Sequence, residues 1–418
     1  MVCRVLAALF LFLLLITGQA SAQDDAPSVD APSVDAPTVD APAEEAASDD
    51  DTPAPLLRGL QLIDAERQND ALSLEDEDAP VTTAPSSTAN LAEIFDRAQL
   101  AYATEDFETA YVHARNAASG GHARAATLAG LLHENGQIEE ASDAQAVRWY
   151  RRAADQTEPV ALYRLGRMAQ AARASLLPTE ARGYFQRAAQ AGNIDAMLAY
   201  ALILKASPVP QDAPFALEWA ERAASQGNAE AMFQLAQMYD VWERGPNNPQ
   251  AAREWYVRAA EANHAEAALQ AGLMASAGEG GPEDAELAIA MVRQSAEAGF
   301  APAMGQYGLM LLNGTGGGEA DAATAAEWFA QGAVGGDAES RFLYAVALAG
   351  GYGVPRDPVR AYYWALMAEY EMDGSRSVNV DRARLAAALE TDLANVFSEA
   401  VVEDVQSEVE AYRNRISR

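Results

Sequence analysis

The chain has 418 residues, half of them hydrophobic, and a formal net charge of −32 at pH 7. This negative charge argues against binding to nucleic acid or to anionic lipid headgroups, because both partners require a basic surface that neutralises phosphate. A basic partner or Ca²⁺ stays open, although self-repulsion that keeps the protein soluble is the simpler explanation.

Residues 1–22 have the pattern of a secretory signal peptide. Arg4 supplies a positive start, residues 5–16 form an apolar run too short to span a bilayer comfortably, and residues 20–22 (Ala-Ser-Ala) resemble a cleavage site. We therefore expect a periplasmic or secreted protein without stable membrane insertion after cleavage. Cys3 is the sole cysteine and would leave with this segment, so we expect no disulfide in the mature protein.

Residues 23–89 predict an acidic, disordered linker rich in Pro and Ala. A pentapeptide at 26–30 (Ala-Pro-Ser-Val-Asp) recurs at 31–35 and, with one change, at 36–40. Few bulky side chains, many prolines and charges of one sign cannot bury enough surface to offset the loss of conformational entropy. The apolar stretch 56–63 could form a transient helix or a docking peptide, but disorder is the favoured interpretation there too.

From residue 90 to 374 a period near 36 residues dominates the sequence. Large side chains recur at spacings of 35 to 37: Trp149, Tyr184, Trp219, Trp255, Met291, Trp328 and Trp364. Small residues keep step with them: Gly130, Gly166, Ala201, Ala236, Gly272, Gly308 and Ala345. A fixed period of this length is typical of a solenoid of helix pairs. We expect each large residue to face a small one, so that the two helices approach closely.

One repeat illustrates the expected layout. Residues 229–239 predict a first helix, a variable loop follows, and residues 249–260 predict a second helix. Second helices end at a glycine, or at Asn263, which suits a left-handed cap. The fold is therefore predicted to be an all-α, right-handed superhelical solenoid of about eight helix pairs. Apolar residues at helical spacing in 375–418 predict one or two helices that cap the last repeat.

These motifs resemble the Sel1-like repeats, relatives of the tetratricopeptide repeats with a longer loop between the two helices. The shared features are Ala-x-Ala openings at 229, 265 and 301, the Tyr307-Gly308-Leu-Met segment, and the loop Gly-x-Gly-Val-Pro-x-Asp at 351–357. The resemblance covers about residues 90–374. It implies a protein-binding scaffold in the cell envelope, as for many bacterial Sel1-like proteins.

Three loops depart from the glycine-rich signature of this family. They contain Leu177-Pro178, Ser207-Pro-Val-Pro210 and Gly245-Pro246. The first unit, residues 91–122, is shorter and looks more like a plain tetratricopeptide repeat. Terminal repeats often differ in this way because they cap the stack.

No catalytic, cofactor or metal site stands out in the sequence. Motifs for a serine nucleophile (G-x-S-x-G), a zinc protease (H-E-x-x-H) and a phosphate loop are absent. Of the four histidines, only His133, beside Glu134, has no place in the repeat template, and one histidine does not make a metal site. We therefore expect a non-enzymatic protein without a cofactor or a bound metal.

The remaining candidate is a groove along the first helices. In the related tetratricopeptide fold, the position three residues before the small residue faces the concave side. Here that row contains Tyr163, Leu198, Phe233, Leu269, Gly305 and Phe342, and one turn later come Arg167, Leu202, Gln237, Leu273, Leu309 and Val346. We predict an apolar strip with a polar edge that binds an extended peptide or an amphipathic helix. The candidate contacts are Tyr163, Arg167, Leu198, Phe233, Gln237, Leu269 and Phe342. Packing between adjacent first helices is the alternative.

The sequence thus predicts an exported scaffold that binds a protein or peptide partner, with the oligomeric state left open. One alternative is a periplasmic regulator that binds the sensor domain of an envelope signalling system. Another is a hydrolase of cell-wall or sugar polymers. The hydrolase would require two carboxylates about 5 to 10 Å apart in a cleft.

Overall fold

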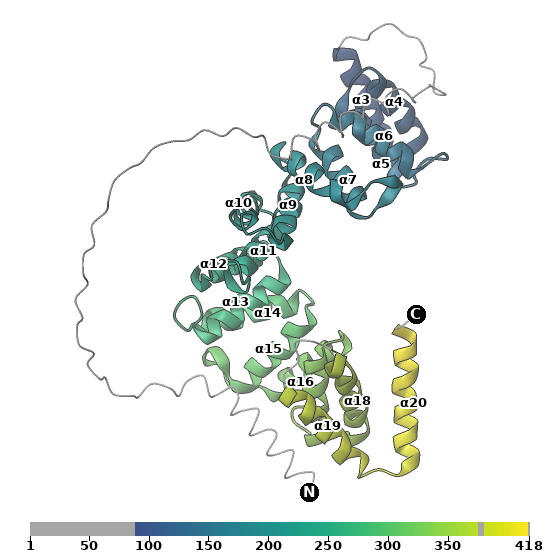
Figure 1. The fold of residues 1–418 in the computed structure, drawn as a ribbon. Helices are drawn as coiled ribbons and strands as arrows, with labels where there is room; N and C mark the ends of the chain where they lie inside the picture. Colours follow the sequence, from purple (N-terminus) through teal and green to yellow (C-terminus); the bar gives the residue numbers. More distant parts are fainter. Residues whose placement is uncertain (1–87, 375–379, 417–418) are drawn as a thin grey trace, which may run out of the picture. The chain divides into compact units, whose positions relative to one another are not determined.

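The computed structural model describes residues 88–374 and 380–416, and the regular elements in these ranges are helical. These residues form 18 α-helices and no strand, which confirms the prediction of an all-α fold. Figure 1 shows the helices following one another along the chain with short connections. The expected signal peptide, and the expected linker up to residue 87, lie outside the described residues.

The described helices belong to two compact units, one ending at Ala125 and the other continuing from Ala126. In the first unit, α3 (Thr88–Ala103) packs against α4 (Phe107–Ser119). The ring of His122 lies over the ring of Phe95, with the two centroids 4.5 Å apart. The aromatic contact therefore closes the end of this helix pair.

The second unit continues the pattern of consecutive helices. Its order is α5 (Ala123–Glu134, which begins in the first unit), α6 (Asp143–Ala154), α7 (Pro159–Gln170), α8 (Ala181–Gln190), α9 (Ile194–Ala206), α10 (Asp212–Ser225), α11 (Ala229–Asp240), α12 (Pro249–Glu261), α13 (Ala265–Ala277), α14 (Ala285–Glu297), α15 (Ala301–Asn313), α16 (Ala322–Val334), α17 (Ala338–Gly350) and α18 (Pro358–Gly374). From α6 to α18 each helix packs against the next. Short 3₁₀ turns lie in the loops at Arg173–Ser175, Pro178–Glu180 and Thr315–Gly317. Successive packed pairs of this kind make a solenoid.

Polar side chains begin most of these helices, and a residue with positive φ follows the second helix of each repeat from α6 to α16. The capping side chains accept a hydrogen bond from the backbone N–H three residues later: Ser142, Glu158, Asn193, Asn228, Asn248, His264, Asp284, Asp321 and Asp337. Gly227 has a φ of 86°, which side chains rarely allow, and Asn263 holds the equivalent place at 65°. The predicted left-handed positions at these repeat ends are confirmed.

The four glycines among the small residues lie against the residue that follows each large one, which corrects the expected pairing by one position. A Cβ atom on Gly166 would lie 2.7 Å from two ring carbons of Phe185, not against Tyr184. The same shift pairs Gly130 with Tyr150, Gly272 with Val292 and Gly308 with Phe329. These facing side chains are almost fully buried, so they set the separation of the two helices within a pair.

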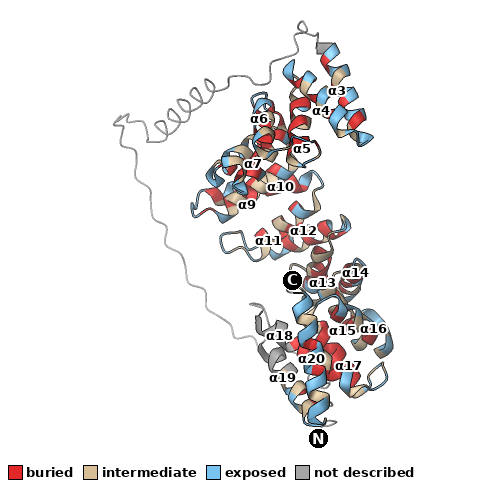
Figure 2. Cartoon of the chain, turned by 90° about the vertical axis from the view of Figure 1, so that its right-hand side faces the viewer, coloured by how far each residue is buried: buried red, intermediate tan, exposed pale blue. Residues whose placement is uncertain are grey.

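The seven large residues themselves are half-buried along the edge of each pair. Trp328 packs edge-on against Tyr307, with ring centroids 5.3 Å apart. The same contact joins Trp219 to Tyr200 and Trp364 to Tyr344. Figure 2 shows that buried and exposed residues alternate along the helices, because one side of each helix is packed. The seven large residues therefore stabilise the helix pairs at their edge.

Two further helices, α19 (Val380–Ala394) and α20 (Glu399–Ile416), pack against α18. Their buried apolar side chains join the cluster around α17 and α18: Leu389, Leu393, Val405 and Val409. Gln406 donates a hydrogen bond of 3.3 Å to the hydroxyl of Tyr362. These helices thus cover the last repeat. Among the described residues, no helix is both long and apolar enough to cross a membrane.

Candidate functional site

The predicted groove row is buried over much of its length. The exposed fractions are 4% for Phe233, 5% for Leu269 and 1% for Phe342. These three side chains lie in the core, which corrects the expectation that they face an open groove, and the alternative of packing between helices holds for them. The other candidates remain accessible: Tyr163, Leu198 and Gln237 are half-buried, and Arg167 is exposed.

For Phe233 and Leu269 the burial arises because the residue that closes the repeat covers the row residue of the first helix, whereas Phe342 belongs to the apolar cluster around α17 and α18. The ring of His264 stacks on the ring of Phe233, with centroids 4.4 Å apart. Nδ1 of His264 accepts a hydrogen bond from the backbone N–H of Ala267, and Nε2 lies 3.1 Å from Oε2 of Glu230. One side chain therefore caps α13 and also seals the row on α11.

Neighbouring repeats achieve the same closure with other side chains. Phe300, which precedes α15, packs with Leu269 in one apolar cluster. At Gly305, an added Cβ atom would lie 2.6 Å from Oγ of Ser340 and 3.5 Å from Oδ2 of Asp337, the cap of α17. In these repeats Leu269 and Gly305 therefore pack against the following repeat.

The row stays open between α7 and α11, where the closing residues are short. Asn193 and Asn228 hold the closing position there. Their Oδ1 atoms accept hydrogen bonds of 2.7 and 2.8 Å from the first turns of α9 and α11. An asparagine used in this way caps a helix but is too small to cover Tyr163 or Leu198 as a ring would. The open row is therefore a consequence of two short side chains.

An open cavity of about 560 Å³ lies beside this row, at the first turns of α7 and α9, and its lining does not include Tyr163 or Leu198. It is lined by Pro159, Val160, Gly192, Asn193, Ile194, Asp195, Gln226, Gly227 and Asn228. Val160 borders it and is 41% exposed. The sequence reasoning missed Val160 and the two asparagines. The sequence signal for this accessible stretch is the residue that closes each repeat, which changes from asparagine to His264 and then to Phe300.

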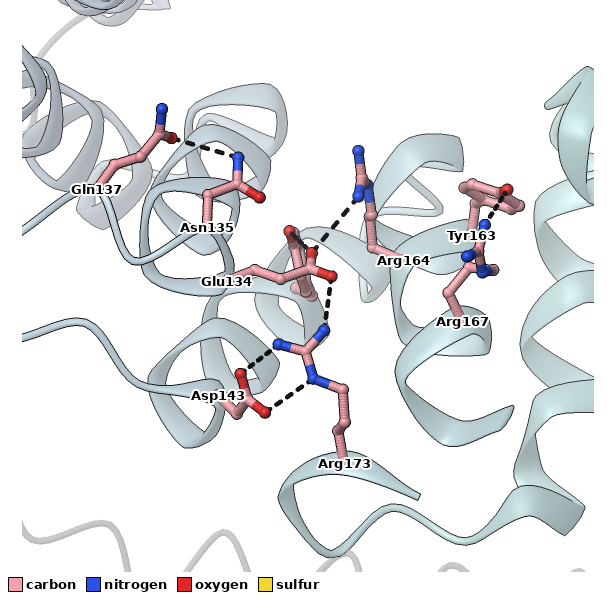
Figure 3. Close-up of polar contacts among 9 residues, drawn as sticks. Glu134, Asn135, Gln137, Asp143, Tyr163, Arg164, Arg167 and Arg173 are labelled. Atoms are coloured by element: carbon pink, nitrogen blue, oxygen red, sulfur yellow. Dashed lines mark hydrogen bonds and ion pairs between the residues drawn. The ribbon is translucent and has the colours of Figure 1, made fainter. Parts of the chain in front are cut away.

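We refer to Val160, Tyr163, Arg167, Leu198 and Leu202 as the α7–α9 face. Arg167 brings a positive charge to it, and Nη1 of Arg167 donates a hydrogen bond of 3.1 Å to the hydroxyl of Tyr163, as Figure 3 shows. Within the described part of the chain, Arg167 has no carboxylate partner. Its charge is therefore available to a bound molecule.

Lys205 lies one turn beyond Leu202 on α9 and is the single lysine of the sequence. Burial lowers the pKa of its ammonium group below the usual range for lysine. Because no other lysine is present, a reagent that modifies lysine side chains is selective for Lys205. Lys205 therefore provides a chemical handle beside the α7–α9 face.

A polar cluster around Glu134 joins α5, α6 and the loop after α7 (Figure 3). The Glu134 carboxylate accepts hydrogen bonds from the hydroxyl of Tyr150 at 2.6 Å and from Nη1 of Arg173 at 3.2 Å. Arg164 lies 3.8 Å away. Arg173 also donates two hydrogen bonds to Asp143, and they lower the pKa of that carboxyl. Burial, followed by the bond to Glu134, raises the pKa of Tyr150.

The cluster holds loops together and lacks the arrangement of a catalytic pair. Both carboxylates, those of Glu134 and Asp143, contact the guanidinium of Arg173. A glycoside hydrolase requires instead one protonated carboxyl and one free carboxylate facing each other across the substrate. Neighbouring His133 is only 4% exposed and lies in the core. In the described ranges, no three His, Cys, Asp or Glu side chains are grouped so that they could hold a metal ion.

Comparison with protein families gives seven matches to the Sel1 repeat. They cover residues 123–157, 159–193, 194–228, 229–264, 265–300, 301–337 and 338–369. Five of these repeats end on the closing residues discussed above, namely Asn193, Asn228, His264, Phe300 and Asp337. The unit formed by α3 and α4 lies before the first match, consistent with its shorter sequence.

Several solved structures are similar to this chain, and two of them have TM-scores above 0.5. One is the crystal structure of c5321, a protective antigen present in uropathogenic Escherichia coli strains displaying an SLR fold; the TM-score is 0.65, with 23% identity over 77% of this chain and 68% of that chain. The other is a Sel1 repeat protein from Oxalobacter formigenes, with a TM-score of 0.55 and 25% identity over 79% of this chain and 94% of that chain. Both support the solenoid fold. No curated protein matches the chain.

Proposed function

The chain belongs to the Sel1 repeat family, and from that premise we propose that it is a non-enzymatic scaffold that binds partner proteins in the bacterial cell envelope. Sel1 repeat proteins generally mediate protein–protein interactions. The observation that carries the proposal is the α7–α9 face, where the first-helix row remains accessible while neighbouring repeats seal it.

The α7–α9 face has the chemistry of a small protein-binding surface. Its centre is apolar, formed by Val160, Leu198 and Leu202, and its aromatic member, Tyr163, carries a hydrogen-bonded Arg167. Tyrosine and arginine are enriched among residues that dominate binding energy, because they combine a large contact area with directional hydrogen bonds. This surface suits an extended peptide or one side of an amphipathic helix.

The charges of Arg167 and Asp195 favour one orientation of a bound segment. The guanidinium of Arg167 is exposed and has no carboxylate neighbour in the described residues, whereas Asp195 lines the cavity beside α9. A bound segment would therefore place an acidic group near Arg167 and a polar or basic group near Asp195, with apolar residues between them. The face thus favours one orientation of the bound segment.

The proposed location rests on the first 22 residues. The positive start, the short apolar run and the Ala-Ser-Ala sequence at 20–22 support export through a cleaved signal peptide. Mass spectrometry of the protein from the envelope of its native host tests this step. A mature chain that begins at Gln23 is expected, and an intact Met1 in the cytoplasmic fraction would refute export.

The single lysine allows a selective test of binding. An amine-reactive crosslinker added to the mature protein in its native envelope extract can attach only at Lys205 and at the N-terminal amine. We expect crosslinks from Lys205 to one partner, and Leu198→Asp is expected to abolish them because it places a charge in the apolar centre. The matched control is Val334→Asp, which changes a residue that is 72% exposed on α16. Equal crosslinking by both variants would overturn the assignment of the α7–α9 face.

A further inference from the structure

A second group of exposed apolar side chains lies on the loops between the two helices of three consecutive repeats, or in the helical turn that follows such a loop. Leu177 is 60% exposed, Val209 45%, Phe215 54% and Val241 70%. We refer to these four residues as the loop patch. They occur in the three repeats whose loops depart from the glycine-rich signature.

Hydrogen bonds connect the neighbouring segments that carry the loop patch. Arg182, at the start of α8, donates two bonds of 3.1 Å to Asp212 at the start of α10. These residues lie within five positions of Leu177 and three of Phe215. Further along, Arg244 donates to the carbonyl oxygens of Ser207, at 2.6 Å, and of Lys205. Those bonds connect the loop of Val209 to the loop of Val241.

The loop patch rests on a fixed support. Pro208, Pro210 and Pro214 restrict the backbone around Val209 and Phe215. Ser207 and Asp212, which flank this segment, are each 8% exposed. A side chain presented by a restrained backbone loses less entropy when it is bound. Phe215 is therefore held outward in advance of any contact.

Aligning the repeats by their period of about 36 residues shows that a phenylalanine is unusual at the position of Phe215. Equivalent positions, four residues before the large residue of each second helix, hold Gln145, Glu180, Ala251, Leu287, Thr324 and Arg360. Most of these are polar or small, as expected for an exposed first turn of a helix. The phenylalanine is packed only in part here, since more than half of its surface faces solvent.

We propose that the loop patch is a second docking surface, and that it binds an apolar segment of a partner protein flanked by basic residues. Of the arginines nearest the patch, Arg182 is paired with the Asp212 carboxylate, whereas Arg244 donates to carbonyl oxygens and keeps its positive charge, so the attraction for a basic partner comes from the net charge of the surrounding chain. Residues 126–418 contain 39 Asp or Glu against 23 Lys or Arg, so the surrounding field attracts a cationic partner. This surface lies on the loop edge and is independent of the α7–α9 face.

The test uses the purified mature protein and a labelled synthetic amphipathic helix of leucine and lysine, with a leucine and glutamate helix for comparison. Binding is measured by fluorescence anisotropy. We expect the lysine helix to bind, and Phe215→Ser combined with Val241→Ser to weaken it about tenfold or more. The matched control combines Val334→Ser with Val396→Ser, which alters residues that are 72% and 60% exposed outside these repeats. The control is expected to bind as the native protein does.

Several outcomes would overturn the proposal. If the patch variant and the control bind the lysine helix equally, the attraction is only the general negative charge of the protein. If the glutamate helix binds as tightly, the charge preference is wrong. If Leu198→Asp alone abolishes binding, the peptide occupies the α7–α9 face. Circular dichroism of each variant shows whether its helices remain folded, which separates lost binding from lost structure.

Discussion

Replacing Gly166 by alanine would test the close approach of α7 and α8. In an ordinary helix interior this change is stabilising, because alanine restricts the unfolded chain more than glycine does. Here the new Cβ atom would lie 2.7 Å from two ring carbons of Phe185 and 3.0 Å from a third. Phe185 is fully buried, so its ring has no free space to move into.

The two effects have comparable size and opposite sign. Adding a methyl group to a packed core destabilises a protein by about 1 to 3 kcal/mol. The gain in helix propensity from glycine to alanine is about 1 kcal/mol. Gly166→Ala is therefore expected to lower the free energy of unfolding by about 1 kcal/mol net. Gly183→Ala, on α8, has no neighbouring atom within 4 Å of the new Cβ and is expected to raise it by up to about 1 kcal/mol.

Urea unfolding followed by circular dichroism measures both variants against the native protein. Amide hydrogen exchange in α7 and α8 should report the same difference locally, since repeat proteins can unfold in parts. Combining Gly166→Ala with Phe185→Leu should recover part of the loss, because the smaller side chain makes room. Equal stabilisation by Gly166→Ala and Gly183→Ala would show that the helices are not in close contact at Phe185.

Further outcomes follow from the same contacts. Phe233→Ala is expected to destabilise the protein by about 3 to 5 kcal/mol in urea unfolding, whereas the half-buried Leu198→Ala should have about half that effect or less. Asp143 has a lowered pKa in the folded state through its bond to Arg173, so its stabilising effect is present above pH 4 and is lost as the pH falls through the folded-state pKa. The stability of native protein and Asp143→Asn should therefore differ at pH 7 and converge on acidification, and a constant difference would contradict this. Gly227→Ala should lower the free energy of unfolding by about 1 to 2 kcal/mol from its φ of 86° alone, since no atom lies near the new Cβ; an unchanged urea midpoint would exclude this strain.

The period near 36 residues was sufficient to predict the helix pairs and their order, but not which neighbour each small residue meets. Adjacent residues on a helix point about 100° apart, so a tryptophan and the residue after it can both face the partner helix. In two repeats the buried member is alanine, Ala220 or Ala365, next to a conspicuous tryptophan. The conspicuous tryptophans therefore lie at the edge of the helix pair, whereas the contact between the two helices is made by the less conspicuous residue that follows.

Accessibility of the groove row could not be predicted from the row alone. Phe233 and Tyr163 occupy equivalent positions, and both are aromatic. Their exposure differs because of a residue about 30 positions later: His264 covers Phe233, whereas Asn193 leaves Tyr163 accessible. Likewise, the bond from Arg173 to Glu134 spans two loops of irregular length, and no repeat register aligns them.

The closing position gives this protein a simple way to change the extent of its accessible surface. Asparagine, aspartate and histidine each cap the following helix there, and Phe300 fills the same place without a side-chain cap. Exchange between a ring and a short side chain therefore exposes or hides one repeat while the backbone stays in register. A binding surface built in this way can lengthen or shorten by one repeat per substitution, so its reach can evolve in single steps without redesign of the helices.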